Sequence, residues 1–299
     1  MDERILYIEA NSGISGDMFV AAMIDLGVDK DMLTRALRSI PADGFEIEIT
    51  RKEKSGLDVC DFDVVLDADH DNHDHDMEYL YGHEQDDEGS MHEQEHGHTH
   101  EHEHVHEHGH AHEHAHEHKS YHAHEHHHRM LKDVYDIIDK TDITDGAKAI
   151  AKKIFDIIAK AESKAHGVAL DQVHFHEVGA IDSIADVIAA AVCVDSLSPD
   201  KVVVSPLSEG TGTVRTQHGI LPIPVPAVTF IAADHQLVLR RSGVRGELVT
   251  PTGAAIVAAI RTDESLPQTY RIEGVGMGGG KRDYENAGIL RTMWITEDK

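Results

Sequence analysis

Two histidines and two aspartates in the middle of the sequence have the spacing of a metal or acid–base site. His174 and His176 are two residues apart, and Asp182 and Asp186 are four apart at the start of an expected helix. Alternate residues of an extended segment point to one side, and residues four apart share one helix face. Imidazoles and carboxylates together suit a divalent transition metal or proton transfer. Glu177 adds a carboxylate, although Asp182 could instead cap the helix and either histidine could be structural.

The loop from Asn11 to Asp17 has the composition of an anion-binding turn. It lies between an expected strand and an expected helix, so backbone N–H groups and hydroxyls could bind an anion at the helix start. It is neither a Walker loop nor a dinucleotide fingerprint, because the required lysine and third glycine are absent. Asp17 suits a metal ion or a proton beside the anion. The predicted ligand-binding residues are Ser12, Gly13, Ser15 and Gly16.

The segment Thr250-Pro-Thr-Gly253 marks a second helix start of the same kind. Thr250, Thr252 and Gly253 could contact an anion there, as the first loop does. Proline in the first turn is also the simplest structural choice. Both interpretations stay open on the sequence alone.

A run of glycines precedes two positive charges near the end of the sequence. Residues 274–280 contain five glycines and are followed by Lys281 and Arg282. Such a run lets backbone approach a ligand closely, or it forms a flexible turn. His166 and His218 are weaker candidates for a site, because each lies beside a glycine at the end of an element.

Residues 67–128 form a histidine-rich tract. The tract contains 22 of the chain's 27 histidines, together with 18 acidic residues and one lysine. So few apolar residues predict a disordered insertion. Imidazoles and carboxylates bind Ni²⁺, Cu²⁺ and Zn²⁺ without selecting nickel, which predicts metal storage or delivery, or else incidental binding by a linker. The densest predicted ligands are His98, His100, His102, His104, His106, His108, His110, His112, His114, His116 and His118.

Apolar runs and helical periodicity alternate through the rest of the chain. Strands are expected at residues 5–9, 45–50, 59–66, 202–204, 269–275 and 289–295, and helices at 18–26, 30–40, 130–138, 143–165, 181–197, 228–233 and 250–260. Within the glycine- and proline-rich passage 210–226, the proline pattern of residues 221–226 disfavours a central strand and predicts an extended, ordered loop. This alternation predicts an α/β or α+β fold with a mixed sheet and flanking helices. We expect one ordered domain made of residues 1–66 and 129–299, interrupted by the insertion at 67–128.

The charge of the chain argues against several classes of protein. With 55 acidic and 27 basic residues, its formal net charge is −28, so no nucleic-acid or membrane partner is expected. No apolar stretch approaches the ~18 residues of a membrane span, and the start lacks the pattern of a signal peptide, which predicts a cytoplasmic protein. Cys60 and Cys193 are too few for a disulfide framework, and Cys193 is expected in the core.

Four blocks of the ordered part resemble the LarC family of nickel insertion proteins. In the family's order they are Ala10-Asn-Ser-Gly-Ile-Ser-Gly-Asp-Met-Phe19, Phe175-His-Glu-Val-Gly-Ala-Ile-Asp-Ser-Ile184, His218-Gly-Ile-Leu-Pro-Ile-Pro-Val-Pro226 and Glu247-Leu-Val-Thr-Pro-Thr-Gly-Ala254. A histidine-rich insertion at this place is also typical of the family. The resemblance implies a metal chelatase of the lyase class. It would insert Ni²⁺ into pyridinium-3,5-bisthiocarboxylic acid mononucleotide during biosynthesis of the nickel-pincer nucleotide cofactor.

The implied reaction forms two nickel–sulfur bonds and one nickel–carbon bond, and it depends on CTP with a divalent cation. A planar, sulfur-bearing acceptor suits nickel, so the substrate would make the selection that the tract cannot. As a hypothesis, His174, His176 and Glu177 bind or position nickel, and Asp17, Asp182 and Asp186 ligate metal or accept the ring proton. The loop from Ser12 to Gly16 would receive the mononucleotide phosphate.

Full-length members of the family carry a further C-terminal domain after the strand that ends near Trp294. CTP is therefore expected to bind a separate C-terminal half, on which activity could depend, and we expect a homo-oligomer. The main alternative is a non-enzymatic nickel store or metallochaperone whose ordered domain only docks the tract. A metal-dependent hydrolase is a weaker alternative, because no hydrolase ligand motif is recognisable.

Overall fold

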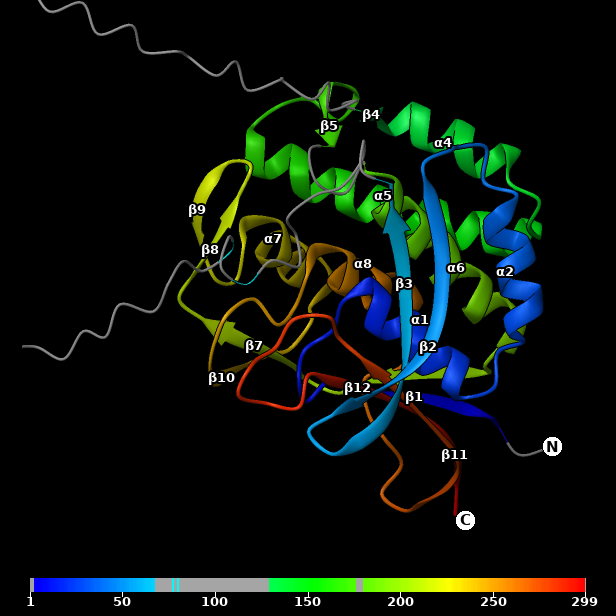
Figure 1. The fold of residues 1–299 in the computed structure, drawn as a ribbon. Helices are drawn as coiled ribbons and strands as arrows, with labels where there is room; N and C mark the ends of the chain where they lie inside the picture. The colour runs from blue at the N-terminus through cyan, green and yellow to red at the C-terminus, as the bar shows by residue number, and fades with distance from the viewer. Residues whose placement is uncertain (1–2, 68–76, 78–79, 81–128, 176–179, 299) are drawn as a thin grey trace, which may run out of the picture. The chain divides into compact units, whose positions relative to one another are not determined.

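The computed structural model describes residues 3–67, 77, 80, 129–175 and 180–298 (Figure 1). They belong to a unit assembled from residues 1–82 and 126–299. The densest histidines of the tract, His98 to His118, lie outside the described residues, as do His176 and Glu177. The disorder of the insertion and the boundaries at 66 and 128 therefore stay predictions.

The largest sheet among the described residues is mixed and has six strands. Its order is β2-β3-β11-β12-β1-β6. The strands are β1 (Ile5–Glu9), β2 (Phe45–Lys54), β3 (Leu57–Leu66), β6 (Lys201–Val204), β11 (Tyr270–Gly279) and β12 (Ile289–Glu297). β1 runs parallel to β6 and antiparallel to β12. The sequence predicted each of these strands, because each carries an apolar run or alternation.

Helices pack in layers on one side of the sheet (Figure 1). α1 contacts β3, β11 and β12, and α6 packs behind it against α5 and α8. α1 and α6 are buried on nearly every face, as expected for helices that are apolar all round. The helices are α1 (Gly16–Asp25), α2 (Lys30–Arg38), α4 (Leu131–Lys140), α5 (Asp145–His166), α6 (Ile181–Leu197), α7 (Pro226–His235) and α8 (Pro251–Ile260).

Six other strands of the described residues form three separate two-stranded sheets. β7 (Leu207–Thr211) pairs in parallel with β10 (Leu239–Arg245), and β4 (Arg129–Met130) pairs with β5 (His174–Phe175), after the 3₁₀ turn η1 (Leu170–Gln172). β8 (Thr213–Thr216) and β9 (Gly219–Pro222) form a hairpin. The loop expected at residues 221–226 occupies 223–225, because β9 extends through Pro222 and α7 begins at Pro226. As expected, no strand of the central sheet passes through this segment, but the hairpin itself was not predicted. Proline is tolerated in such an isolated hairpin, because Pro222 ends β9.

The glycines of residues 274–280 have a packing role that the sequence analysis did not predict. Most of the run belongs to β11, so a flexible turn was the wrong expectation. A Cβ atom on Gly276 would lie 2.1 Å from the carbonyl oxygen of Ala22, and one on Gly278 would lie 2.1 Å from that of Met18. Glycine is required here because α1 packs directly on the backbone of the strand.

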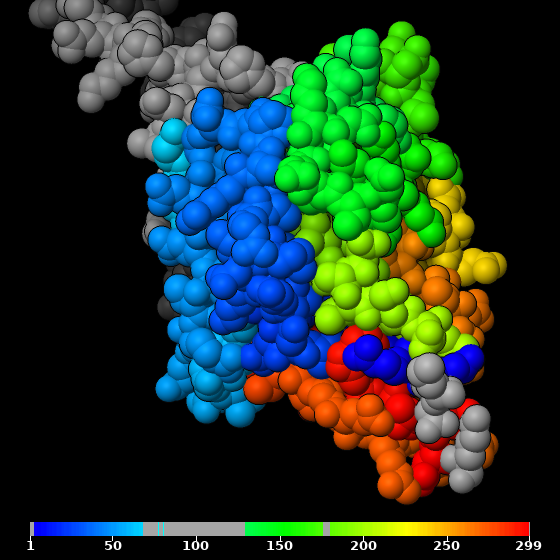
Figure 2. Space-filling view, turned by 90° about the vertical axis from the view of Figure 1, so that its right-hand side faces the viewer, coloured from blue at the N-terminus to red at the C-terminus, as the bar shows by residue number. Residues whose placement is uncertain are grey.

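The expected mixed sheet with flanking helices is confirmed. On the face shown in Figure 2, the blue residues of α2 lie between the lighter blue β2–β3 hairpin and the green residues of α4 and α5. The backbone N–H of Asp142 donates to Ser39 Oγ at 2.9 Å, which joins the ends of α2 and α4. Cys193 is buried in the core, as predicted. None of the helices in the described ranges combines the length and apolar character that a membrane crossing needs.

Candidate functional site

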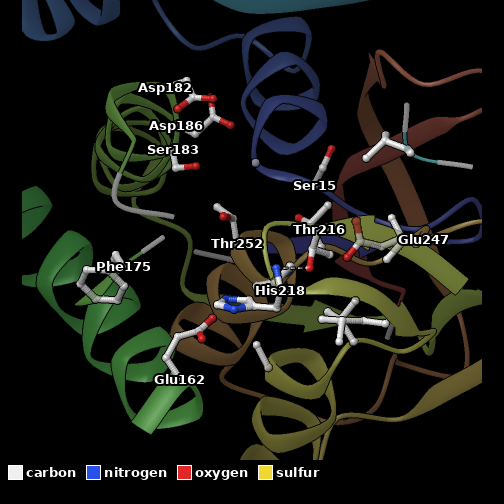
Figure 3. Close-up of a pocket in the computed structure, with 18 of the residues that line it drawn as sticks. Ser15, Glu162, Phe175, Asp182, Ser183, Asp186, Thr216, His218, Glu247 and Thr252 are labelled. Carbon is white, nitrogen blue, oxygen red and sulfur yellow. Dashed lines mark hydrogen bonds between the residues drawn. The ribbon is translucent and has the colours of Figure 1, made fainter. Parts of the chain in front are cut away.

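A cavity of about 390 Å³ opens where four helices begin. The starts of α1, α6, α7 and α8 line it, through residues 15–17, 182, 183, 186, 225–227 and 250–252 (Figure 3). Backbone N–H groups at helix starts carry partial positive charge and favour anions. A volume in this range fits a small-molecule ligand. The fold thus brings the starts of four helices, which are far apart in the sequence, to one cavity.

Three of the four helix starts lack a capping side chain. Ser15, Ala180 and Val225 are the N-cap residues of α1, α6 and α7, and none of them makes a side-chain cap hydrogen bond. Thr250 does cap α8, because the N–H of Gly253 donates to its Oγ1 at 3.1 Å. A bound anion could therefore satisfy first-turn N–H groups of three helices that no capping side chain occupies.

Asp17, Asp182 and Asp186 meet at one end of the cavity. Asp182 and Asp186 lie together in Figure 3, and the hydroxyl of Ser15 donates to Asp17 Oδ1. A Cβ atom on Gly16 would lie 2.6 Å from Asp186 Oδ2, so glycine is needed for α1 and α6 to approach. The structure brings together the three aspartates that sequence analysis selected, from two helix starts.

Burial and neighbouring charge perturb the ionisable groups of this cluster. Burial raises the pKa of Asp186 well above its ordinary value, the negative charge of Asp17 raises it further, and Lys281 opposes both. Burial alone would lower the pKa of Lys281, but Asp17, Asp186 and Asp63 together raise it. Lys281 also forms an ion pair with Asp63. The cluster therefore favours a proton on Asp186 and a charge on Lys281.

A smaller cavity of about 70 Å³ shares Asp17 with the first and is also lined by Ser12, Lys281 and Arg282. Nη1 of Arg282 lies 2.8 Å from Oε2 of Glu247, and the Tyr284 hydroxyl donates to the backbone oxygen of Glu247 at 2.9 Å. Glu247 lines both cavities and was missed as a site residue, because its position depends on these distant partners.

The segment 247–250 supports the loop before α1. The N–H of Ile14 donates to the Leu248 oxygen at 2.8 Å. Gly13 has a φ of +89°, and a Cβ atom there would lie 2.1 Å from the same oxygen. A Cβ atom on Gly253 would lie 2.3 Å from the backbone oxygen of Ile14. Close packing of the two loops therefore accounts for Gly13 and Gly253, and their predicted contacts with a ligand stay predictions.

Buried Glu209 accepts backbone hydrogen bonds from this segment. Its Oε1 accepts the N–H groups of Gly210 at 2.7 Å, Leu248 at 2.9 Å and Val249 at 3.3 Å. Its Oε2 is buried without a hydrogen-bond partner among the described residues. Burial raises the pKa of Glu209 to about 7, although the three backbone hydrogen bonds oppose the rise. At neutral pH a proton on Oε2 competes with ionisation.

Glu162, His166 and His218 lie together elsewhere in the cavity lining. Nε2 of His166 is 3.3 Å from Oε2 of Glu162, and the imidazole centroids of His166 and His218 are 4.8 Å apart. Burial and His166 lower the pKa of His218, and burial raises that of Glu162. Glu162 was not predicted as a site residue, although its spacing of four from His166 on a helix could have indicated the pair.

The other residues predicted for the site do not form a cluster with the aspartates. His174 is exposed on β5 and does not line the cavity, whereas its neighbour Phe175 does. Thr252 is buried in the lining. Among the described ranges, no three His, Cys, Asp or Glu side chains already converge as a metal centre. The predicted metal roles of His174, His176 and Glu177 stay predictions.

Comparison with known proteins identifies the family. The model of the nickel insertion protein family matches residues 6–299. The chain belongs to the nickel insertion protein family. It is 48% identical over 294 residues to the pyridinium-3,5-bisthiocarboxylic acid mononucleotide nickel insertion protein of Alkaliphilus metalliredigens, an alignment that covers 98% of this chain and 61% of the relative.

Other members of the family give the same picture. The protein of the same name from Acetivibrio thermocellus is 34% identical over 290 residues, covering 97% of this chain and 60% of the relative. A putative nickel insertion protein from Dictyoglomus thermophilum is 32% identical over 288 residues, covering 96% of this chain and 60% of the relative. The chain therefore spans about three-fifths of the length of these curated relatives. No solved structure matches it.

Proposed function

We propose that this chain inserts nickel into pyridinium-3,5-bisthiocarboxylic acid mononucleotide, the molecule named for its relatives. The observation that carries the proposal is the cavity in which four helix starts meet a cluster of three aspartates that are buried or half-buried. The substrate bears two thiocarboxylates and a phosphate, all anionic, which helix N-termini attract. The predicted contacts of Ser12, Ser15 and Thr252 with this substrate belong to the proposal.

The aspartates supply the proton chemistry that insertion needs. When nickel forms its bond to ring carbon, the carbon–hydrogen bond breaks and the proton must leave to a base. Asp186 suits this role in its ionised form, which the positive charge of a neighbouring Ni²⁺ would favour, because a carboxylate with a raised pKa is a stronger base than an ordinary one. Asp17 and Asp182 would hold the incoming Ni²⁺ substrate by their carboxylate oxygens, and Lys281 would limit the local negative charge.

We assign CTP to a different part of the protein. Lys281 and Arg282 are each paired with a carboxylate, Asp63 and Glu247 respectively, so the described residues at this end offer no cationic cluster to a triphosphate. We therefore propose that CTP and its divalent cation bind a portion corresponding to the unmatched two-fifths of the longer relatives. Homo-oligomer formation and a cytoplasmic location stay predictions of the sequence.

An insertion assay tests the proposed function. Purified chain is mixed with Ni²⁺ and the metal-free mononucleotide, with and without CTP and the C-terminal portion of a longer relative, and the nickelated mass is measured. We expect Asp186→Asn to lower the rate by about 10²–10⁴-fold, the range of general base catalysis. The exposed Asp136→Asn on α4 is the matched control and should retain the wild-type rate.

The same assay separates catalysis from storage. A nickel store would transfer its bound metal once, without spending CTP, and Asp186→Asn would behave as wild type. An insertion protein turns over repeatedly when nickel and substrate are in excess. If the complete mixture yields no nickelated product, the proposed function is wrong.

A further inference from the structure

The histidines His166 and His218 come from separate elements and meet at the cavity. His166 is the last residue of α5, and His218 lies in the turn between β8 and β9. Both residues are exposed and both line the cavity. Figure 3 shows Glu162 and His218 pointing toward one another, away from Asp182 and Asp186. Solvent and the cavity can therefore both reach the two imidazoles.

We propose that His166 and His218 together bind one divalent transition-metal ion, with one ring nitrogen each, at this rim of the cavity. Glu162 would orient the ring of His166. The binding of the ion follows from these three side chains alone, whereas its onward passage to a substrate rests on the proposed function.

The separation of the two rings fits a shared ion. A metal–imidazole nitrogen bond is about 2.1 Å, which places the ring centroid about 3.2 Å from the metal. Two imidazoles at about 90–110° around one ion then have centroids about 4.5–5.2 Å apart. The observed separation is 4.8 Å, and the ring planes make an angle of 58°, so the rings are not stacked flat.

The carboxylate of Glu162 gives His166 the arrangement of a metal-binding histidine. Its Oε2 lies 3.3 Å from Nε2 of His166, one helical turn away. A histidine whose one nitrogen donates to a carboxylate keeps the lone pair of the other nitrogen for a metal, and the carboxylate fixes the ring orientation. Glu162 also contributes negative charge beside the ion.

Two imidazoles make a site that can give up its ion. No third His, Cys, Asp or Glu among the described residues converges with them as a complete metal centre, so water would fill the other coordination positions. Labile water can be replaced by the softer sulfur ligands of a substrate, which bind nickel well. The site therefore suits an ion in transit between solvent and the cavity.

Another histidine in a different charge environment provides a control. His235 ends α7 and has Lys153, Lys160 and Arg261 as charged neighbours, besides Asp234. Because these cations repel a metal ion, we expect His166 and His218 to bind the ion and His235 not to bind it.

Chemical footprinting tests the proposal on the full chain without substrate. Diethyl pyrocarbonate modifies neutral imidazoles, and peptide mass spectrometry reports each histidine separately while a metal buffer sets free Ni²⁺. We expect Ni²⁺ to protect His166 and His218 over the same concentration range and to leave His235 reactive. In His218→Ala, half-protection of His166 should need at least about tenfold more free Ni²⁺, and Glu162→Gln should shift it in the same direction.

The reciprocal variant and a control keep the test decisive. His166→Ala should weaken protection of His218 by a similar factor, and His235→Ala should change neither histidine. Equal reactivity of His166 and His218 with and without Ni²⁺, while histidines of the tract are protected, would overturn the proposal. So would unchanged protection of His166 in His218→Ala. Because no mononucleotide is present, either result leaves the insertion function to be judged by its own assay.

Discussion

Glu209→Gln should change how the stability of the chain depends on pH. Glu209 is 2% exposed, and its pKa rises from an ordinary value of 4.5 to about 7 on folding. A carboxyl group whose pKa is raised in the folded state contributes stability that is fully present below pH 4.5 and is lost as pH rises through 7. Glutamine keeps the Oε1 acceptor for three backbone N–H groups but cannot ionise.

The size of the stability change follows from the pKa shift of Glu209. Each pKa unit corresponds to about 1.4 kcal/mol, so the full effect is about 3 kcal/mol, of which about 2.5 kcal/mol develops between pH ~5 and pH ~8. Over that range the free energy of unfolding of the wild type should fall relative to Glu209→Gln. The buried amide adds a constant penalty, because its N–H groups occupy the place of Oε2, so the comparison uses the change with pH.

Urea denaturation at several pH values measures how the free energy of unfolding changes with pH. Fluorescence of Trp294 reports unfolding, since the chain has one tryptophan. A chelator removes metal from the histidine tract in every sample. The exposed Glu48→Gln serves as control, because its side chain stays in water and should leave the difference from wild type constant with pH. Parallel pH curves for wild type and Glu209→Gln would refute the reasoning.

Three further results are expected. Gly276→Ala should destabilise the fold by about 1–3 kcal/mol in urea denaturation, whereas Gly274→Ala, whose nearest neighbour would be 3.6 Å away, should be nearly neutral; equal effects would contradict the packing of α1 on β11. Deleting residues 67–128 should spare insertion measured at abundant Ni²⁺ but weaken it at scarce Ni²⁺, and loss under both conditions would favour a store. Cys60 and Cys193 should resist alkylation in mass spectrometry until the chain unfolds, since both are buried and burial raises both pKa values; rapid labelling of the folded chain would contradict their burial.

Local sequence patterns predicted much of the fold. α6 was expected at its observed bounds, because its apolar run is long enough to be a buried helix. β10 was not predicted, because the sequence Leu-Arg-Arg-Ser-Gly-Val-Arg has no apolar alternation, and its pairing with β7 depends on tertiary contacts. The order of the six strands was unreadable for the same reason.

The site was predictable where its residues are close in sequence. Asp182 and Asp186 were selected by their helical spacing, and Asp17 by its place at a loop between strand and helix. The meeting of His166 with His218 was not predictable, since α5 and the β8–β9 turn approach only in the folded chain. The glycines of β11 suggested a ligand loop because glycine indicates close approach without showing what approaches.

Binding of the metal-free mononucleotide to the cavity tests the central claim most directly. Calorimetric titration into the chain should show one bound molecule, and Ser183→Phe, which fills the cavity lining, should abolish that binding. Ser196→Phe, exposed at the far end of the same helix, should bind as wild type does. No binding to the wild type, or equal binding by the two variants, would contradict a cavity built to hold this substrate.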